Sequence, residues 1–138
     1  MKRLIFRTMN AVHGGLYRMS GGKLGGTMRG VPILLLRTRG RKSGKEYTTP
    51  LMFGRDGNNL VLVASKGGDP RNPAWYHNLH AGEAEVQIGH EHRRVRARDA
   101  AGAERERLWN QMVGVYPPYA GYQQKTTRQI PVVLLEPV

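Results

Sequence analysis

Residues 32–66 read PILLLRTRGRKSGKEYTTPLMFGRDGNNLVLVASK, and this stretch carries most of the information about the fold. It holds three apolar segments of strand length, residues 32–38, 46–54 and 59–66, separated by two turns that contain glycine. The second turn, RDGNN, is typical of a β-hairpin because Asp-Gly and Asn tolerate a positive φ. The three segments therefore predict a β-meander.

The rest of the chain alternates short helical and extended segments. Asn72 and Pro73 predict the N-cap and the first residue of a helix over residues 73–81. Asp99 is expected to cap a second helix that ends near Gly114. Further strands are expected at residues 83–89, 92–100 and 130–137, and a loop or short helix at residues 116–129.

Six strands with only two helices among them indicate a mainly antiparallel sheet closed as a barrel, and not βαβ units. The length of 138 residues suits a single domain over residues 1–138 with one core. The chain has no cysteine, which excludes a disulfide framework, a thiolate zinc site and a thiol nucleophile. No apolar run approaches the ~20 residues of a membrane span, and charged residues interrupt any signal-peptide core, so we expect a cytoplasmic protein.

The charge is concentrated near the start of the chain. The net charge is +12, and residues 1–50 contain eleven Lys or Arg and one acid. Such a field favours an anionic partner: nucleic acid, anionic lipid or an acidic small molecule. Residues 3–19 have the spacing of a basic amphipathic helix, which either packs on the domain or lies on an anionic membrane surface.

The turn GRKSGK, residues 40–45, contains several candidate anion ligands. It is not a P-loop, because only three residues separate Gly40 from Gly44 and a strand follows instead of a helix. Arg41, Lys42 and Ser43 can nevertheless all donate hydrogen bonds to a phosphate. The alternative is an ordinary solvated hairpin turn.

Two other segments combine reactive side chains. Ser65 and Lys66 stand at a strand end just before two glycines, a common place for ligands, or they are simply a polar strand terminus. The helix NPAWYHNLH offers two histidines but no third ligand nearby, so we expect no metal site. Three phenols spaced by three residues either stack on a flat ligand and supply a proton, or cover the core as an aromatic lid: Tyr116, Tyr119 and Tyr122.

Four segments together, GRKSGKEYTTPL, VASKGGDPRNPAWYHNL, YPPYAGY and IPVVLLEP, resemble the deazaflavin-dependent nitroreductase family. These are oxidoreductases of actinobacteria that use coenzyme F420 and include quinone reductases. The resemblance covers the chain from about Gly25 to Pro137. It implies a six-stranded antiparallel split β-barrel like that of FMN-binding proteins, with two or three short helices.

The resemblance also implies the site. Reduced F420 would give a hydride to a flat, electron-poor acceptor: a quinone, an activated alkene or a nitro-aromatic. The phosphate and oligoglutamate tail would lie on the cationic turn, and a phenol or Ser65 would supply the proton. The implied cofactor ligands are Arg41, Lys42, Ser43, Pro50, Met52, Ala64, Ser65, Lys66, Trp75 and Asn78, and the implied catalytic residues are Ser65, Tyr116, Tyr119 and Tyr122.

Two positions depart from the family pattern. Tyr47 stands where close relatives place an arginine for the cofactor tail. Met52 stands where a tyrosine faces the substrate in a prominent member of the family. These two residues bear on tail binding and on the choice of acceptor.

Two alternatives to the F420 interpretation are a nucleic-acid-binding domain and a split barrel that binds FMN, haem or lipid. The first is suggested by the pI near 10.7 and by the basic strand HEHRRVRARDA. However, the tyrosines and Trp75 are separated from most cations, whereas single-stranded nucleic acid needs the two interleaved. We therefore expect no nucleic-acid partner.

Overall fold

The computed structural model describes residues 27–138. The helix expected at residues 3–19, and with it the expected membrane contact, lies outside the described residues. No helix in residues 27–138 is long and apolar enough to cross a membrane.

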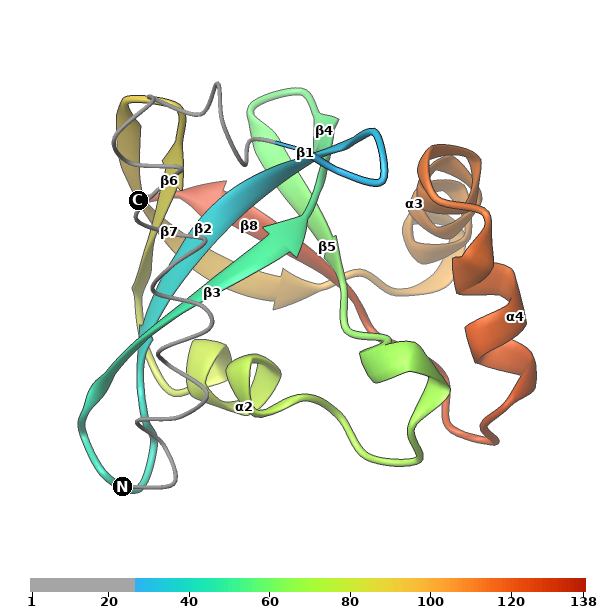
Figure 1. Cartoon of the computed structure of the whole chain (residues 1–138), viewed down its shortest axis with the longest axis horizontal. Helices are drawn as coiled ribbons and strands as arrows, with labels where there is room; N and C mark the ends of the chain where they lie inside the picture. Colours follow the sequence, from blue (N-terminus) through green and yellow to red (C-terminus); the bar gives the residue numbers. More distant parts are fainter. Residues whose placement is uncertain (1–26) are drawn as a thin grey trace.

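The described chain forms one antiparallel sheet with three α-helices and one 3-10 helix (Figure 1). The strands are β1 (Thr27–Met28), β2 (Val31–Arg39), β3 (Glu46–Met52), β4 (Gly54–Asp56), β5 (Asn59–Val63), β6 (Ala84–Ile88), β7 (Glu91–Asp99) and β8 (Val132–Pro137). The helices are the 3-10 helix η1 (Lys66–Gly68) and α2 (Ala74–His80), α3 (Gly102–Val115) and α4 (Pro118–Gln124). The six expected strands are thus present, and the sheet contains two further short strands, β1 and β4.

The sheet curls into a half-barrel. The strand order is β1-β2-β6-β7-β8-β5-β4, and β3 pairs with β2 outside this path. Because only Phe53 separates β3 from β4, the chain itself links the β2–β3 pair near one end of this order to β4 at the other end. The mainly antiparallel, split-barrel expectation is confirmed at the level of the fold.

The predicted meander is wrong in one respect. Residues 46–54 are two strands, because β3 pairs with β2 whereas β4 pairs with β5. The break falls at Phe53, whose ring is buried in the core and whose N–H donates to the Pro32 carbonyl at 3.3 Å. Burying this side chain bends the strand from one wall of the half-barrel to the next.

Strands β5 and β8 each have a neighbouring strand on both sides and are covered on both faces, which explains their continuous apolar sequences. Leu60, Leu62, Val133 and Leu135 belong to the core cluster on the α2 side. The alternate residues Val61, Val63, Val132 and Leu134 pack with α3 and α4. The sheet therefore separates two cores, and the α3–α4 core contains two of the three candidate tyrosines.

Both predicted helix caps are wrong. Pro73 is the N-cap of α2, and the Asn72 side chain instead accepts a hydrogen bond from Arg128. Asp99 remains in β7, where its carboxylate binds the Tyr76 hydroxyl and the His80 ring of α2, and α3 begins after Ala101. In both cases a partner distant in sequence occupies the side chain that would otherwise cap the helix.

The bend at Phe53 gives a stability prediction. Phe53→Ala should lower the free energy of unfolding by about 3–5 kcal/mol, because it removes a buried ring and leaves a cavity. Urea denaturation followed by circular dichroism measures the change. Val138→Ala, at an exposed position, should leave the midpoint unchanged. If Phe53→Ala were as stable as the wild type, burial of this ring could not be the reason for the bend.

Candidate active site

Two adjoining pockets form one groove. The first, of about 340 Å³, is called here the tyrosine pocket, and the second, of about 540 Å³, the turn pocket. Pro73 and Trp75 line both, so the pockets meet at the start of α2. Figure 1 shows α2 and η1 between the β2–β3 hairpin and the α3–α4 pair.

The groove gathers all the sequence-predicted site residues except one. The tyrosine pocket is lined by Pro50, Met52, Ser65, Lys66, Trp75, Tyr116, Tyr119 and Tyr122. The turn pocket is lined by Arg41, Lys42, Ser43, Trp75 and Asn78. Ala64 lines neither pocket, because it is fully buried and its N–H donates to the Pro131 carbonyl at 3.0 Å.

The cationic turn is held in a fixed shape. The Gly40 N–H donates to the Lys45 carbonyl at 2.7 Å, and the Arg41 N–H donates to the Asn78 side chain on α2 at 3.0 Å. A Cβ on Gly40 would lie 2.5 Å from the Ser43 hydroxyl and 2.9 Å from the Tyr47 ring, so a side chain there would displace both. Among residues 27–138, no acceptor is found for the N–H groups of Lys42 and Ser43. These two neighbouring donors, beside two cationic side chains, suit an oxyanion.

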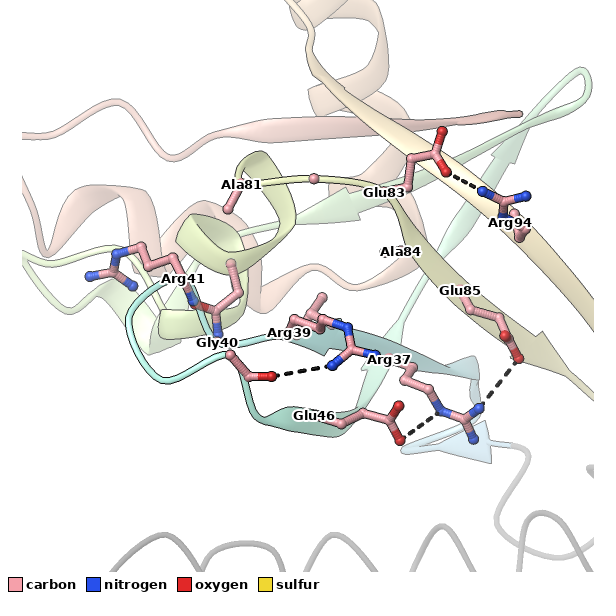
Figure 2. Close-up of a pocket in the computed structure, with 14 residues that line it drawn as sticks. Arg37, Arg39, Gly40, Arg41, Glu46, Ala81, Glu83, Ala84, Glu85 and Arg94 are labelled. Atoms are coloured by element: carbon pink, nitrogen blue, oxygen red, sulfur yellow. Dashed lines mark hydrogen bonds and ion pairs between the residues drawn. The ribbon is translucent and has the colours of Figure 1, made fainter.

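A third pocket, of about 690 Å³, adjoins the turn pocket, but its charges are mostly balanced. Figure 2 shows Arg37 between Glu46 and Glu85, each at 3.6 Å, while Arg41 extends away from this cluster. Arg94 pairs with Glu83 in the same pocket. The cations available to an anion are therefore those of the turn itself.

Thr38 is a residue that sequence reasoning missed at the boundary of these pockets. It lines both the turn pocket and its neighbour, and it is only 3% exposed. Its hydroxyl has no hydrogen-bond partner in the described part of the chain. A buried hydroxyl at a pocket wall can serve a bound acceptor.

The three tyrosines pack against one another at the other end of the groove, with Tyr119 edge to face against each of the other two. The Tyr116 and Tyr119 ring centroids are 5.0 Å apart at 74°, and the Tyr119 hydroxyl donates to the Met52 sulfur at 3.9 Å. Burial, reinforced by the other two phenols, raises the pKa of Tyr119 to about 12. The hydroxyl oxygens of Tyr116 and Tyr122 are 3.4 Å apart, and this hydrogen bond, with partial burial, raises the pKa of Tyr122.

Arg128 fixes the loop that carries Ser65 and Lys66. Its guanidinium donates to the Ser65 and Asp69 carbonyls at 2.8 Å each, to the Ala64 carbonyl at 3.2 Å and to the Asn72 side chain at 2.8 Å. Desolvation lowers the pKa of Arg128, but an arginine stays charged in proteins. No local pattern marks this residue, because the partners of its guanidinium lie more than 50 positions away.

The loop also has an unusual backbone. Lys66, Gly67 and Gly68 all have positive φ, at 46°, 64° and 87°. Gly68 lies under α4, where a Cβ would be 2.7 Å from the Tyr122 carbonyl, whereas a Cβ on Gly67 would meet nothing within 4 Å. The close approach at Gly68 thus sets the distance between the loop and the tyrosine helix.

No metal site is found in this region. Residues 27–138 contain no cluster of three or more His, Asp or Glu side chains that could hold a metal ion. His80 is bound to Asp99 at 2.9 Å, on the side of α2 that faces β7.

The fold first defines the class. The haem storage protein HutZ of Vibrio cholerae is 12% identical, with a TM-score of 0.61 over 94% of this chain and 90% of that one. At this identity the likeness shows the fold alone, which is that of the split-barrel, FMN-binding-like proteins.

Closer relatives define the family. The family described as F420H(2)-dependent quinone reductase matches residues 9–137. A Mycobacterium tuberculosis F420H(2)-dependent quinone reductase is 42% identical over 130 residues, 90% of this chain and 87% of that protein. The solved F420-H2 dependent reductase FDR-A is 47% identical, with a TM-score of 0.70 over 76% of this chain and 94% of that chain. A solved chain described as a domain-swapped dimer is 41% identical, with a TM-score of 0.71 over 94% and 99%.

The chain belongs to the F420H(2)-dependent quinone reductase family. It is therefore an oxidoreductase with reduced coenzyme F420 as its cofactor, which confirms the resemblance seen in the sequence.

The two loop glycines give a matched pair of variants. Gly67→Ala should lower the free energy of unfolding by about 1 kcal/mol, the cost of a left-handed alanine. Gly68→Ala carries the same cost and also pushes α4 outward, so it should be less stable than Gly67→Ala by a further ~1–3 kcal/mol.

Chemical denaturation of the two variants and the wild type gives these differences. Near-ultraviolet circular dichroism, which reports tyrosine packing, should change only in Gly68→Ala. Equal stabilities and spectra would contradict the close contact between Gly68 and α4.

Proposed function

We propose that this chain transfers a hydride from reduced F420 to a flat, quinone-like acceptor in the groove. The observation that carries the proposal is that the turn pocket and the tyrosine pocket share Pro73 and Trp75. A ligand with a flat ring and an anionic tail can occupy both at once. A nitro-aromatic or an activated alkene has the same flat shape and would enter the same pocket.

The residues present fit such a cofactor. At the turn, Arg41 and Lys42 supply charge, and the N–H groups of Lys42 and Ser43 have no acceptor among the described residues. Phosphate and carboxylate oxygens would complete these donors. Tyr47 lines the turn pocket in place of the family's arginine and adds no cation there.

At the other end the chain positions and shields the ring. Pro50, Met52 and Trp75 offer apolar surface to a flat ring, and the tyrosines exclude water. Ser65, only 8% exposed, would place its hydroxyl at the edge of the ring. The bound deazaflavin supplies the hydride chemistry, and the protein's part is to orient, to exclude water and to provide a proton.

The nucleic-acid alternative loses its main support. Each arginine of the basic strand β7 has a carboxylate partner: Arg93 with Glu91, Arg94 and Arg96 with Glu83, and Arg98 with Glu104 and Glu136. A phosphate backbone would have to compete with these pairs. No comparable observation favours FMN, haem or lipid as the ligand.

The proposed location is the cytoplasm, with residues 1–19 in contact with the inner face of the membrane, where a lipid quinone would be met. Co-sedimentation of the full chain with phosphatidylglycerol vesicles tests this contact. Binding that disappears with phosphatidylcholine vesicles and at high salt supports it. Equal recovery in the supernatant with both lipids contradicts it.

The turn gives a binding prediction. Neutralising Arg41 and Lys42 together, as Arg41→Gln with Lys42→Gln, should weaken F420 binding by at least about 10-fold, since a charged hydrogen bond contributes ~1.5–3 kcal/mol. Quenching of tryptophan fluorescence during titration with F420 gives the Kd. FMN and a short DNA duplex are titrated alongside at two salt concentrations.

The control is Arg55→Gln with Arg96→Gln, which removes the same charge from residues that do not line the groove. It should bind F420 like the wild type. Unchanged F420 binding by the turn variant would reject the turn as the tail site. Salt-sensitive DNA binding that the turn variant loses would favour the nucleic-acid alternative.

A further inference from the structure

Arg29 reaches the tyrosine pocket from outside the sequence motifs. It lies in the two-residue turn between β1 and β2, and its Nη1 donates to the Tyr116 hydroxyl at 3.1 Å. No carboxylate pairs with Arg29 among residues 27–138. The positive charge is therefore directed at a phenol.

The backbone at Arg29 is one that arginine rarely adopts. Its φ is +52° and that of Gly30 is +79°, a pair of values typical of hairpin turns built from Asn-Gly. A non-glycine residue in this region costs about 1–2 kcal/mol. The turn alone thus gives no reason for an arginine, whereas the contact of its side chain with Tyr116 does.

The contact with Arg29 leaves the proton of Tyr116 available to Tyr122. Arginine has only donors, so the Tyr116 oxygen accepts from Arg29. The single proton of Tyr116 is then free to point at the Tyr122 oxygen, 3.4 Å away. Either phenol can donate in this pair; when Tyr116 donates, the proton of Tyr122 points elsewhere, and Tyr122 lines the pocket.

Tyr119 is not part of this chain of hydroxyls. Its own hydroxyl is aimed at the Met52 sulfur, and it is more deeply buried than Tyr122. Of the three phenols, Tyr122 therefore stands at the end of a polarised pair, and Tyr119 stands apart. The ammonium of Lys125 lies 5.8 Å from the Tyr122 ring centre and adds a second positive charge close to this phenol.

We propose that Arg29, Tyr116 and Tyr122 form a proton relay to the acceptor, a role that rests on the proposed hydride transfer. When the hydride and its electron pair reach a quinone, negative charge appears on a quinone oxygen. Tyr122 breaks its O–H bond and gives the proton to that oxygen, and Tyr116 replaces the proton on Tyr122. Arg29 stabilises the charge left on Tyr116 until water at the exposed turn returns a proton.

Atoms and electrons balance in this step. The acceptor gains two electrons, one hydrogen from the hydride and one proton from the relay, and becomes a hydroquinone. The donor loses the same two electrons and is thereby oxidised. Arg29 acts through Tyr116 and is a positioning residue, whereas Tyr122 is the catalytic proton donor. The relay favours acceptors whose reduction places charge on an oxygen atom.

The test compares Arg29→Asn, Arg29→Lys and Tyr122→Phe with the wild type. Asparagine tolerates the left-handed turn better than arginine, so Arg29→Asn should fold with an equal or higher Tm. Its F420 Kd should be unchanged. Its kcat with a water-soluble benzoquinone should fall by about 10-fold or more, because proton delivery contributes ~10²–10⁴-fold. Arg55→Gln, a cation outside the groove, is the control.

Three readouts distinguish the relay from a structural role. In Arg29→Asn the solvent deuterium isotope effect on kcat should rise while KM stays constant, and Arg29→Lys should recover part of kcat. Tyr122→Phe should slow the reaction at least as much as Arg29→Asn.

An unchanged kcat and isotope effect in Arg29→Asn, or in Tyr122→Phe, would overturn the relay while wild-type turnover leaves the proposed function standing. Loss of F420 binding in Arg29→Asn would also overturn it, because Arg29 would then belong to the cofactor site. A wild type that binds no F420 and reduces no quinone would overturn the proposed function itself, and the relay with it.

Discussion

The groove depends on one partly buried cation, the guanidinium of Arg128. Four acceptors from a single loop converge on it, three of them backbone carbonyls. Buried carbonyls left without donors would each cost about 1–3 kcal/mol, so the loop has a strong reason to keep this shape. Ser65 and Lys66 open the loop, Trp75 follows it, and α4 rests on it at Gly68. Both pockets thus share a wall whose position one side chain determines.

The excess positive charge is divided between two uses. On β7 the arginines are paired with acids, and on α3 Arg107 is paired with Asp56 of β4. Around the groove the cations contact neutral groups instead: Arg29 a phenol, Arg39 the Gly44 carbonyl and Arg128 the loop carbonyls. The unpaired charge therefore surrounds the place where an anionic cofactor and a developing oxyanion would lie. Net charge alone could not reveal this division, because it depends on which partners the fold brings together.

The strands and the β4–β5 hairpin turn could be predicted from local periodicity and glycine positions, whereas the grouping of the site residues in one groove was implied only by the resemblance to a family. Prediction from the sequence failed where a distant residue decided the outcome. Asn72 and Asp99 are good local caps, but Arg128 and the α2 side chains occupy them in the folded chain. The bend at Phe53 comes from burial against two different walls, which a strand pattern does not contain. Arg29 has no local signal, since its partner Tyr116 lies 87 positions later.

The position of β8 has a consequence for the order in which the molecule can form. Leu60 of β5 lies opposite Leu135 of β8, and Val95 of β7 lies opposite Pro137, so β8 fills the gap between strands made much earlier. Strands so far apart along the chain pair slowly, because a long loop must close before their contacts contribute any favourable free energy. Until residues 128–137 leave the ribosome, β5 and β7 each have an edge without its partner strand, and the Ser65 loop lacks Arg128. Synthesis therefore passes through a period in which the nascent chain is prone to aggregation and the groove is incomplete.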